Sequence, residues 1–99
     1  MAIYLLLSTL TGEGRKAIEE YPEKLKDLNK EVEYMGVKII AQYALLGQYD
    51  FVTIIEAPSN EKAAELAIHM SAGGLQSLTL AAIPLNKLIE TLKKKPQVF

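Results

Sequence analysis

Short apolar runs alternate along this chain with stretches of helical periodicity, and together they predict its elements. Runs rich in Ile, Leu, Tyr and Val are typical of strands. They cover Ala2 to Leu10, Val37 to Leu46, Asp50 to Ala57 and Leu75 to Ile83. We expect these four runs to form strands, with the second and third joined as a hairpin through Gly47-Gln48-Tyr49.

Between the first two strands, apolar residues recur at steps of three and four, which is typical of one helix face. Pro22 interrupts this stripe, and proline fits only the first turn of a helix. The pattern therefore predicts a short helix from about Glu13 to Glu20, a kink, and a longer helix from Pro22 to Met35. Gly36 supplies the left-handed stop.

Two more helices follow. One should begin after the N-cap Ser59 and end at Gly73-Gly74. The other should open at Pro84 and carry an apolar stripe of Leu85, Leu88, Ile89 and Leu92. The order β-α-β-β-α-β, with an additional C-terminal helix, predicts an α+β, ferredoxin-like fold in a single domain over residues 1–99.

Neither face of the predicted sheet alternates cleanly between apolar and polar residues. Strict alternation gives one wholly apolar face, which suits the helices, and it contains Ile3, Leu5 and Leu7. The other face is apolar with scattered polar groups. These groups are Tyr4, Ser8, Lys38, Gln42 and Thr53.

An uncovered face of this mixture would form a large adhesive patch. A second copy that covers it with the same face solves the problem and makes a homodimer, the dimeric α+β barrel arrangement. The polar scatter then predicts a cavity between the two sheets. The alternative is a monomer in which the C-terminal helix folds back over this face.

The central stretch "LGQYDFV", with Gly47, Tyr49 and Asp50, resembles the signature of the GYD domain family. Further matches are "IIEAP" at Ile54 to Pro58, Leu10-Thr11, Pro22 and Ala82-Ile83-Pro84. The resemblance spans nearly the whole chain. It implies a dimeric α+β barrel, a group that includes cofactor-independent monooxygenases, isomerases, haem proteins and sensing domains. The family itself has no established activity, and a shared fold does not transfer function.

The "GQYD" corner contains the first candidate residues. Gly47 is expected to adopt a positive φ in the hairpin. Asp50 is expected to accept backbone N–H groups, with a role as catalytic base as the alternative. Tyr49 is expected to pack at an interface, and the alternative is a hydrogen bond to a ligand.

Two candidates lie outside this corner. His69 is the single histidine, and we expect it on a partly exposed helix face, with proton transfer as its catalytic alternative. Lys38 could anchor an anionic ligand. The ligand-binding candidates are Tyr4, Lys38, Gln42, Tyr49 and Thr53, and the catalytic candidates are Asp50, Tyr49 and His69.

Composition narrows the classes of function. A chain without cysteine has no disulfide or thiolate chemistry, and a single histidine leaves no multi-histidine metal site. We therefore expect no metal and no cofactor. A net charge of −1 gives no reason to expect nucleic acid or a membrane as partner. Lys93-Lys94-Lys95 is interpreted as the cationic end of the last helix.

The apolar N-terminus lacks the basic leader of a signal peptide, and no apolar run reaches the ~20 residues that cross a membrane. We expect a cytoplasmic protein. Three functions remain open: a homodimeric binding protein for a small, largely apolar molecule, a cofactor-independent oxygenase or isomerase, and a sensor module without an output domain.

Overall fold

The computed structural model of the chain describes residues 1–94. The elements are β1 (Ala2–Leu10), α1 (Gly12–Glu20), α2 (Lys24–Tyr34), β2 (Lys38–Ala44), β3 (Phe51–Ala57), α3 (Asn60–Ala72), β4 (Leu75–Ala82) and α4 (Leu85–Lys94). This order confirms the predicted α+β, ferredoxin-like fold with an additional C-terminal helix. Most boundaries differ from the predicted ones by only one or two residues.

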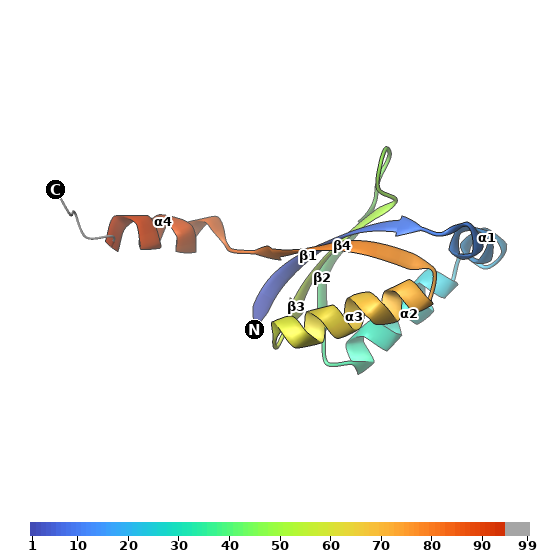
Figure 1. Ribbon diagram of the computed structural model, residues 1–99, viewed down its shortest axis with the longest axis horizontal. Helices are drawn as coiled ribbons and strands as arrows, with labels where there is room; N and C mark the ends of the chain where they lie inside the picture. The colour runs from blue at the N-terminus through green and yellow to red at the C-terminus, as the bar shows by residue number, and fades with distance from the viewer. Residues whose placement is uncertain (95–99) are drawn as a thin grey trace.

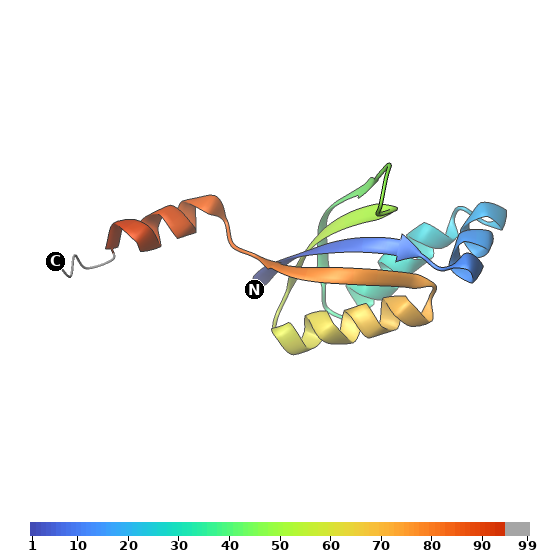
Figure 2. The same ribbon diagram turned by 45° about the horizontal axis from the view of Figure 1, so that its top comes forward.

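The four strands form one antiparallel sheet in the order β2-β3-β1-β4. Helices α2 and α3 lie against one face of this sheet, and α1 lies beyond the end of β1 (Figure 1, Figure 2). We call the opposite face the open face. No described element of the same chain covers it in either view.

Local sequence signals set the ends of the helices. The side chains of Thr11 and Ser59 accept N–H groups in the first turns of α1 and α3. Gly36 follows α2 with a φ of 85°. Pro22 lies in the turn between α1 and α2, so the predicted kink is a complete break between two helices.

The hairpin between β2 and β3 is longer than predicted. Its loop covers residues 45–50, because β2 ends at Ala44 and β3 begins at Phe51. The N–H of Leu45 donates to the carbonyl of Asp50 at 2.8 Å and closes the loop. Gly47 has a φ of 114°, as the turn chemistry predicted.

The core lies between the sheet and helices α2 and α3. Its buried apolar members are Tyr4, Leu6, Val32, Val37, Ile55, Ala57, Ala63, Leu66, Met70 and Leu75. Leu66 of α3 and Leu6 and Ile55 of the two central strands are each 0% exposed. Contacts of this kind hold α3 against the sheet.

The prediction that the wholly apolar face meets the helices is wrong. The side chains of Tyr4, Leu6 and Ser8 are buried on the helix side, whereas Ile3, Leu5 and Leu7 of β1 are only partly buried, on the open face. Both faces of β1 contain enough apolar residues to form a core. Periodicity alone therefore could not decide which face the helices cover.

A β-bulge in β2 changes which residues share a face. Ile39 pairs with Ile55 but Ala41 pairs with Ile54, so the register shifts between them. After this shift, Gln42 lies opposite Thr53 on the helix side. The predicted grouping of Lys38 with Gln42 on one face is therefore wrong, because strict alternation assumes a strand without a bulge.

Helix α4 does not fold back over the sheet. Figures 1 and 2 show it beyond the end of β4, apart from α2 and α3, and all of its residues are exposed. The fold-back of the C-terminal helix over the sheet, on which the monomer alternative depended, is therefore not present in the described chain. Lys93 and Lys94 occupy the last turn of α4, as predicted, and Lys95 lies outside the described residues. None of the described helices has the length and apolar character needed to span a membrane.

Candidate functional site

The open face is an aliphatic surface. At its centre Leu5 of β1 pairs with Ile54 of β3 on one side and with Leu80 of β4 on the other. The apolar side chains of this face are Ile3, Leu5, Leu7, Ala41, Tyr43, Val52, Ile54, Leu78, Leu80 and Ala82. Several of them are strongly exposed, with Tyr43 at 60%, Leu78 at 48% and Leu80 at 42%.

Charged groups on the open face lie toward one corner. Lys38 pairs across the strands with Glu56, where β2 begins and β3 ends. The face is about seven residues long, at ~3.3 Å per residue, and four strands wide, at ~4.8 Å per strand. Its projected area is therefore roughly 400 Å². Apolar patches of this size on soluble proteins are typically interaction sites.

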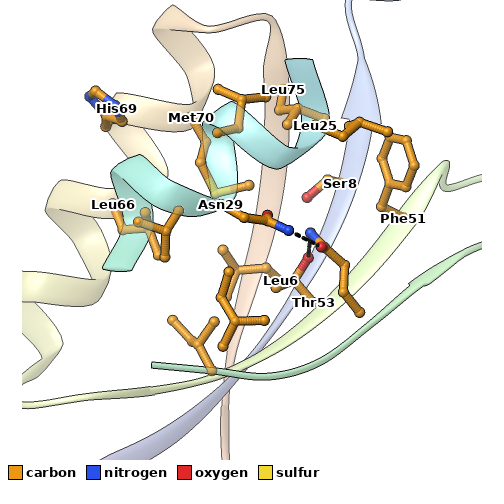
Figure 3. Close-up of a pocket in the computed structure, with 15 residues that line it drawn as sticks. Leu6, Ser8, Leu25, Asn29, Phe51, Thr53, Leu66, His69, Met70 and Leu75 are labelled. Atoms are coloured by element: carbon orange, nitrogen blue, oxygen red, sulfur yellow. Dashed lines mark hydrogen bonds between the residues drawn. The ribbon is translucent and has the colours of Figure 1, made fainter. Parts of the chain in front are cut away.

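A narrow slot lies on the other side of the sheet, between the sheet and helices α2 and α3 (Figure 3). Its volume is about 20 Å³, which is room for one water molecule and not for an organic ligand. Leu6, Leu66 and Met70 contribute apolar walls, and Ser8 and Thr53 contribute hydroxyl groups.

Hydrogen bonds cross this slot. The amide of Asn29 on α2 donates to Gln42 Oε1 at 2.7 Å, and Gln42 Nε2 donates to Thr53 Oγ1 at 3.1 Å. Figure 3 shows this chain of bonds extending from the helix to the sheet. It therefore links α2 to the edge strand β2 and the neighbouring β3.

A second polar group lies deeper on the same side of the sheet. The hydroxyl oxygens of Ser8 and Ser77 are 3.0 Å apart on neighbouring strands. Thr79 Oγ1 is buried and has no hydrogen-bond partner among the described residues. The face that packs on the helices is thus the more polar face of the sheet.

Asp50 ties the hairpin to the rest of the molecule. Its Oδ2 accepts the backbone N–H of Leu10 at 2.8 Å and lies 3.6 Å from the guanidinium of Arg15. Its own N–H donates to the carbonyl of Ser8 at 2.8 Å. The carboxylate therefore accepts a backbone donor, as predicted, but the donor belongs to β1 and not to its own turn.

The structure separates the other candidate residues. His69 lies on the exposed side of α3, with Nε2 3.1 Å from Glu31 Oε2 on α2, and it borders the slot. Tyr4 is buried, and its hydroxyl donates to Asn60 Oδ1. Among the described slot-lining residues are Gln42, Thr53 and His69, but not Tyr4, Lys38, Tyr49 or Asp50.

Sequence reasoning missed Asn29, Ser77 and Thr79 as members of the polar groups between the sheet and the helices. Asn29 falls on a helix at a position next to the apolar stripe, and the serine and threonine lie on a strand whose alternation had not been assigned to a face. Because Ser77 and Thr79 are two residues apart, the alternation of a strand places both hydroxyls on the same face.

A family model of the GYD domain matches residues 4–92. The chain belongs to the GYD domain family. The match begins within β1 and ends within α4, so the hairpin corner and the slot and nearly all of the open face lie in the matched region.

Two known proteins resemble this GYD domain. The chain is 42% identical over 95 residues to the "Glutamine synthetase and cystathionine beta-lyase binding protein" of Thermus thermophilus, a match over 94% of this chain and 100% of that protein. The crystal structure of FFRP-DM1 superimposes with a TM-score of 0.59 over 84% of this chain and 100% of that one, at 15% identity. At such low identity the second likeness shows the fold alone.

Proposed function

We propose that this chain is a homodimeric binding protein whose partners are enzymes. The open face carries the proposal, because it presents a continuous aliphatic surface that no described element of the chain covers. A surface of this kind needs a partner in water.

The first partner of the open face is a second copy of the chain. A twofold axis through the centre of the face would pack Leu5, Ile54 and Leu80 of one copy on the same residues of the other. Most of the charge on the face lies near the corner at Lys38 and Glu56, so few charged groups would be buried at the centre. This is the dimeric α+β barrel in its simplest form.

Enzymes are proposed as further partners because of the Thermus thermophilus relative. Its name states that it binds glutamine synthetase and cystathionine beta-lyase, and this chain covers its whole length. A dimer built on the open faces would leave both helix layers exposed for such partners.

Isothermal titration calorimetry tests the proposal. The purified chain is titrated into glutamine synthetase and into cystathionine beta-lyase, with an unrelated oligomeric dehydrogenase as control. Saturable binding to either of the first two enzymes, and none to the dehydrogenase, is the expected result. Equal heats for all three enzymes would contradict partner recognition.

A second candidate function is the binding of a small, largely apolar molecule in the slot, and its enzymatic variant is a cofactor-independent oxygenase or isomerase. The Asn29–Gln42–Thr53 chain at the slot supports it, because a few placed polar groups in a largely apolar site can orient a ligand. Because the slot is small, α2 would have to move outward.

Thermal melts with small aromatic alcohols as probes test this second function. A rise in the melting midpoint that saturates with probe concentration, and that is lost in Gln42→Ala, supports it. Identical melting midpoints with and without every probe would exclude it.

A further inference from the structure

We propose that α4 of one copy docks into the groove between α2 and α3 of another copy. The groove lies on the outer surface of the helix layer and has a volume of about 580 Å³. Residues that line it include Glu31, Tyr34, Met35, Glu65, Ile68 and Ala72. This contact adds a second interface to the proposed dimer and does not need the open face.

Helix α4 has an apolar stripe without a partner in the described chain. Leu85, Leu88, Ile89 and Leu92 lie at helical spacing on one side, and they are 68%, 45%, 40% and 60% exposed. A ten-residue helix with an exposed stripe of this kind is marginal in water on its own. Packing against another surface would stabilise it.

The groove has matching properties. Tyr34 is 95% exposed and Ile68 is 74% exposed, so the groove offers large apolar side chains to a helix stripe. Two carboxylates line it, Glu31 on α2 and Glu65 on α3. Each has a basic neighbour, with Glu31 3.1 Å from His69 and Glu65 3.2 Å from Lys62, but both carboxylates are more than half exposed and remain open to a further cation. The α4 helix contains Lys87, Lys93 and Lys94 against a single Glu90, so its charge is opposite to that of the groove.

The chain cannot place α4 in its own groove. Only Ile83 and Pro84 connect β4 to α4, and two residues span at most about 7 Å. Figures 1 and 2 both show α4 beyond the far end of β4, separated from α2 and α3. An α4 that docks into this groove must therefore come from a neighbouring molecule.

The contact joins two different surfaces, so it either closes as a reciprocal exchange between two copies or continues from copy to copy. When it joins one open-face dimer to another, it builds assemblies larger than a dimer. In a dimer formed through the open faces, both grooves and both α4 helices remain available. Each dimer would then contact its neighbours at four places, through its two grooves and its two α4 helices.

Disulfide trapping between two variants tests this contact, and the natural chain offers no competing thiol because it contains no cysteine. Ile68→Cys protein is mixed with affinity-tagged Ile89→Cys protein and oxidised, so that only a bond between two molecules joins the two positions. A groove contact should give at least about tenfold more mixed product than Leu46→Cys with Ile89→Cys, because docking raises the local thiol concentration. Leu46 is fully exposed in the hairpin loop and serves as the matched control.

Equal yields in the two mixtures would overturn the proposal. A higher yield from Leu80→Cys with Ile89→Cys than from the groove pair would also overturn it, and would place α4 on the open face. Light scattering measures the mass of the assembly and so distinguishes the α4 contact from the open-face dimer. Leu88→Glu disrupts the α4 contact and should reduce a larger assembly to a dimer. Leu80→Lys disrupts the open face instead. A Leu88→Glu variant that keeps the full wild-type mass would contradict the α4 contact alone.

Discussion

Asp50 shows how one side chain of the family signature organises a corner of the fold. Its carboxylate accepts the N–H of Leu10 at the end of β1 and lies near Arg15 in α1. The hairpin and the β1–α1 junction, which are forty positions apart in sequence, therefore meet at this group. Its half-buried position next to a backbone donor favours a structural role over a catalytic one.

Two substitutions of Asp50 separate these roles. Asp50→Asn keeps one acceptor oxygen and should be mild, whereas Asp50→Ala leaves the Leu10 N–H without a partner and should cost about 1–3 kcal/mol. Chemical denaturation of both variants measures the difference. If both unfold at the wild-type midpoint, Asp50 is not needed for the corner and becomes the leading catalytic candidate.

Two glycines at the start of α1 give a second test at this scale. Gly14 packs directly on the backbone of Gly74, so that a Cβ on Gly14 would collide with the Gly74 carbonyl, whereas Gly12 has open space around it. Gly14→Ala should destabilise by about 1–3 kcal/mol through overpacking. Gly12→Ala should be neutral or stabilise by up to ~1 kcal/mol, because alanine favours the helix.

Thermal melts compare the two glycine variants. The predicted order of midpoints is Gly12→Ala at or above wild type and Gly14→Ala clearly below it. Equal midpoints would show that α1 can shift away from β4 at no cost.

At the residue scale, the sequence was informative where chemistry is local. The N-cap Ser59 and the positive φ of Gly36 and Gly47 were all predicted, because each depends only on neighbouring residues. The donor to Asp50 could not be predicted, since Leu10 is forty positions away.

At the scale of elements, the polar character of the helix side of the sheet is the unexpected feature. Ser8, Thr53 and Ser77 are hydrogen-bonded there, but Thr79 Oγ1 has no partner among the described residues. A buried hydroxyl without a partner reduces stability. Thr53, which is hydrogen-bonded, and Thr79, which is not, are therefore suited to a direct comparison by substitution.

Thr79→Val should leave stability unchanged or raise it by about 1 kcal/mol, because it replaces the unpartnered hydroxyl with a methyl group of similar size. Thr53→Val removes the acceptor of Gln42 Nε2 and should destabilise by about 1–2 kcal/mol. Urea unfolding of the two variants measures both changes. If Thr79→Val lowers the free energy of unfolding as much as Thr53→Val does, the Thr79 hydroxyl has a partner, such as ordered water.

Periodicity predicted the helices and strands and their order, but it did not predict which side of the sheet each strand residue lies on. Helical spacing and turn residues were sufficient for the four strands and for most helix ends. The bulge at Ile40 left no sequence signal that alternation could detect, and it reversed the side on which Gln42 lies. Thr53 borders the slot for a different reason, because the helices cover the face of β1 and β3 that contains Leu6 and Thr53. Gln42 and Thr53 therefore both border the slot and not a cavity between two sheets.

At the scale of the whole molecule, two apolar surfaces of the described chain lack an intramolecular partner: the open face and the stripe of α4. The sequence indicated that one sheet face would need a cover, because both faces contain apolar residues. It could not indicate that α4 extends away from the body, since a helix stripe does not specify what it packs against.

Size-exclusion chromatography with light scattering tests the central claim, that the open face is covered by a second copy. At micromolar concentration the wild-type chain should have twice the 11.0 kDa chain mass or a larger even multiple of it. Leu80→Lys, which places a charge on the open face, should lower that mass, and Leu46→Lys in the exposed loop should leave it unchanged. A wild-type mass of 11.0 kDa, or a Leu80→Lys variant with the full wild-type mass, would contradict the account.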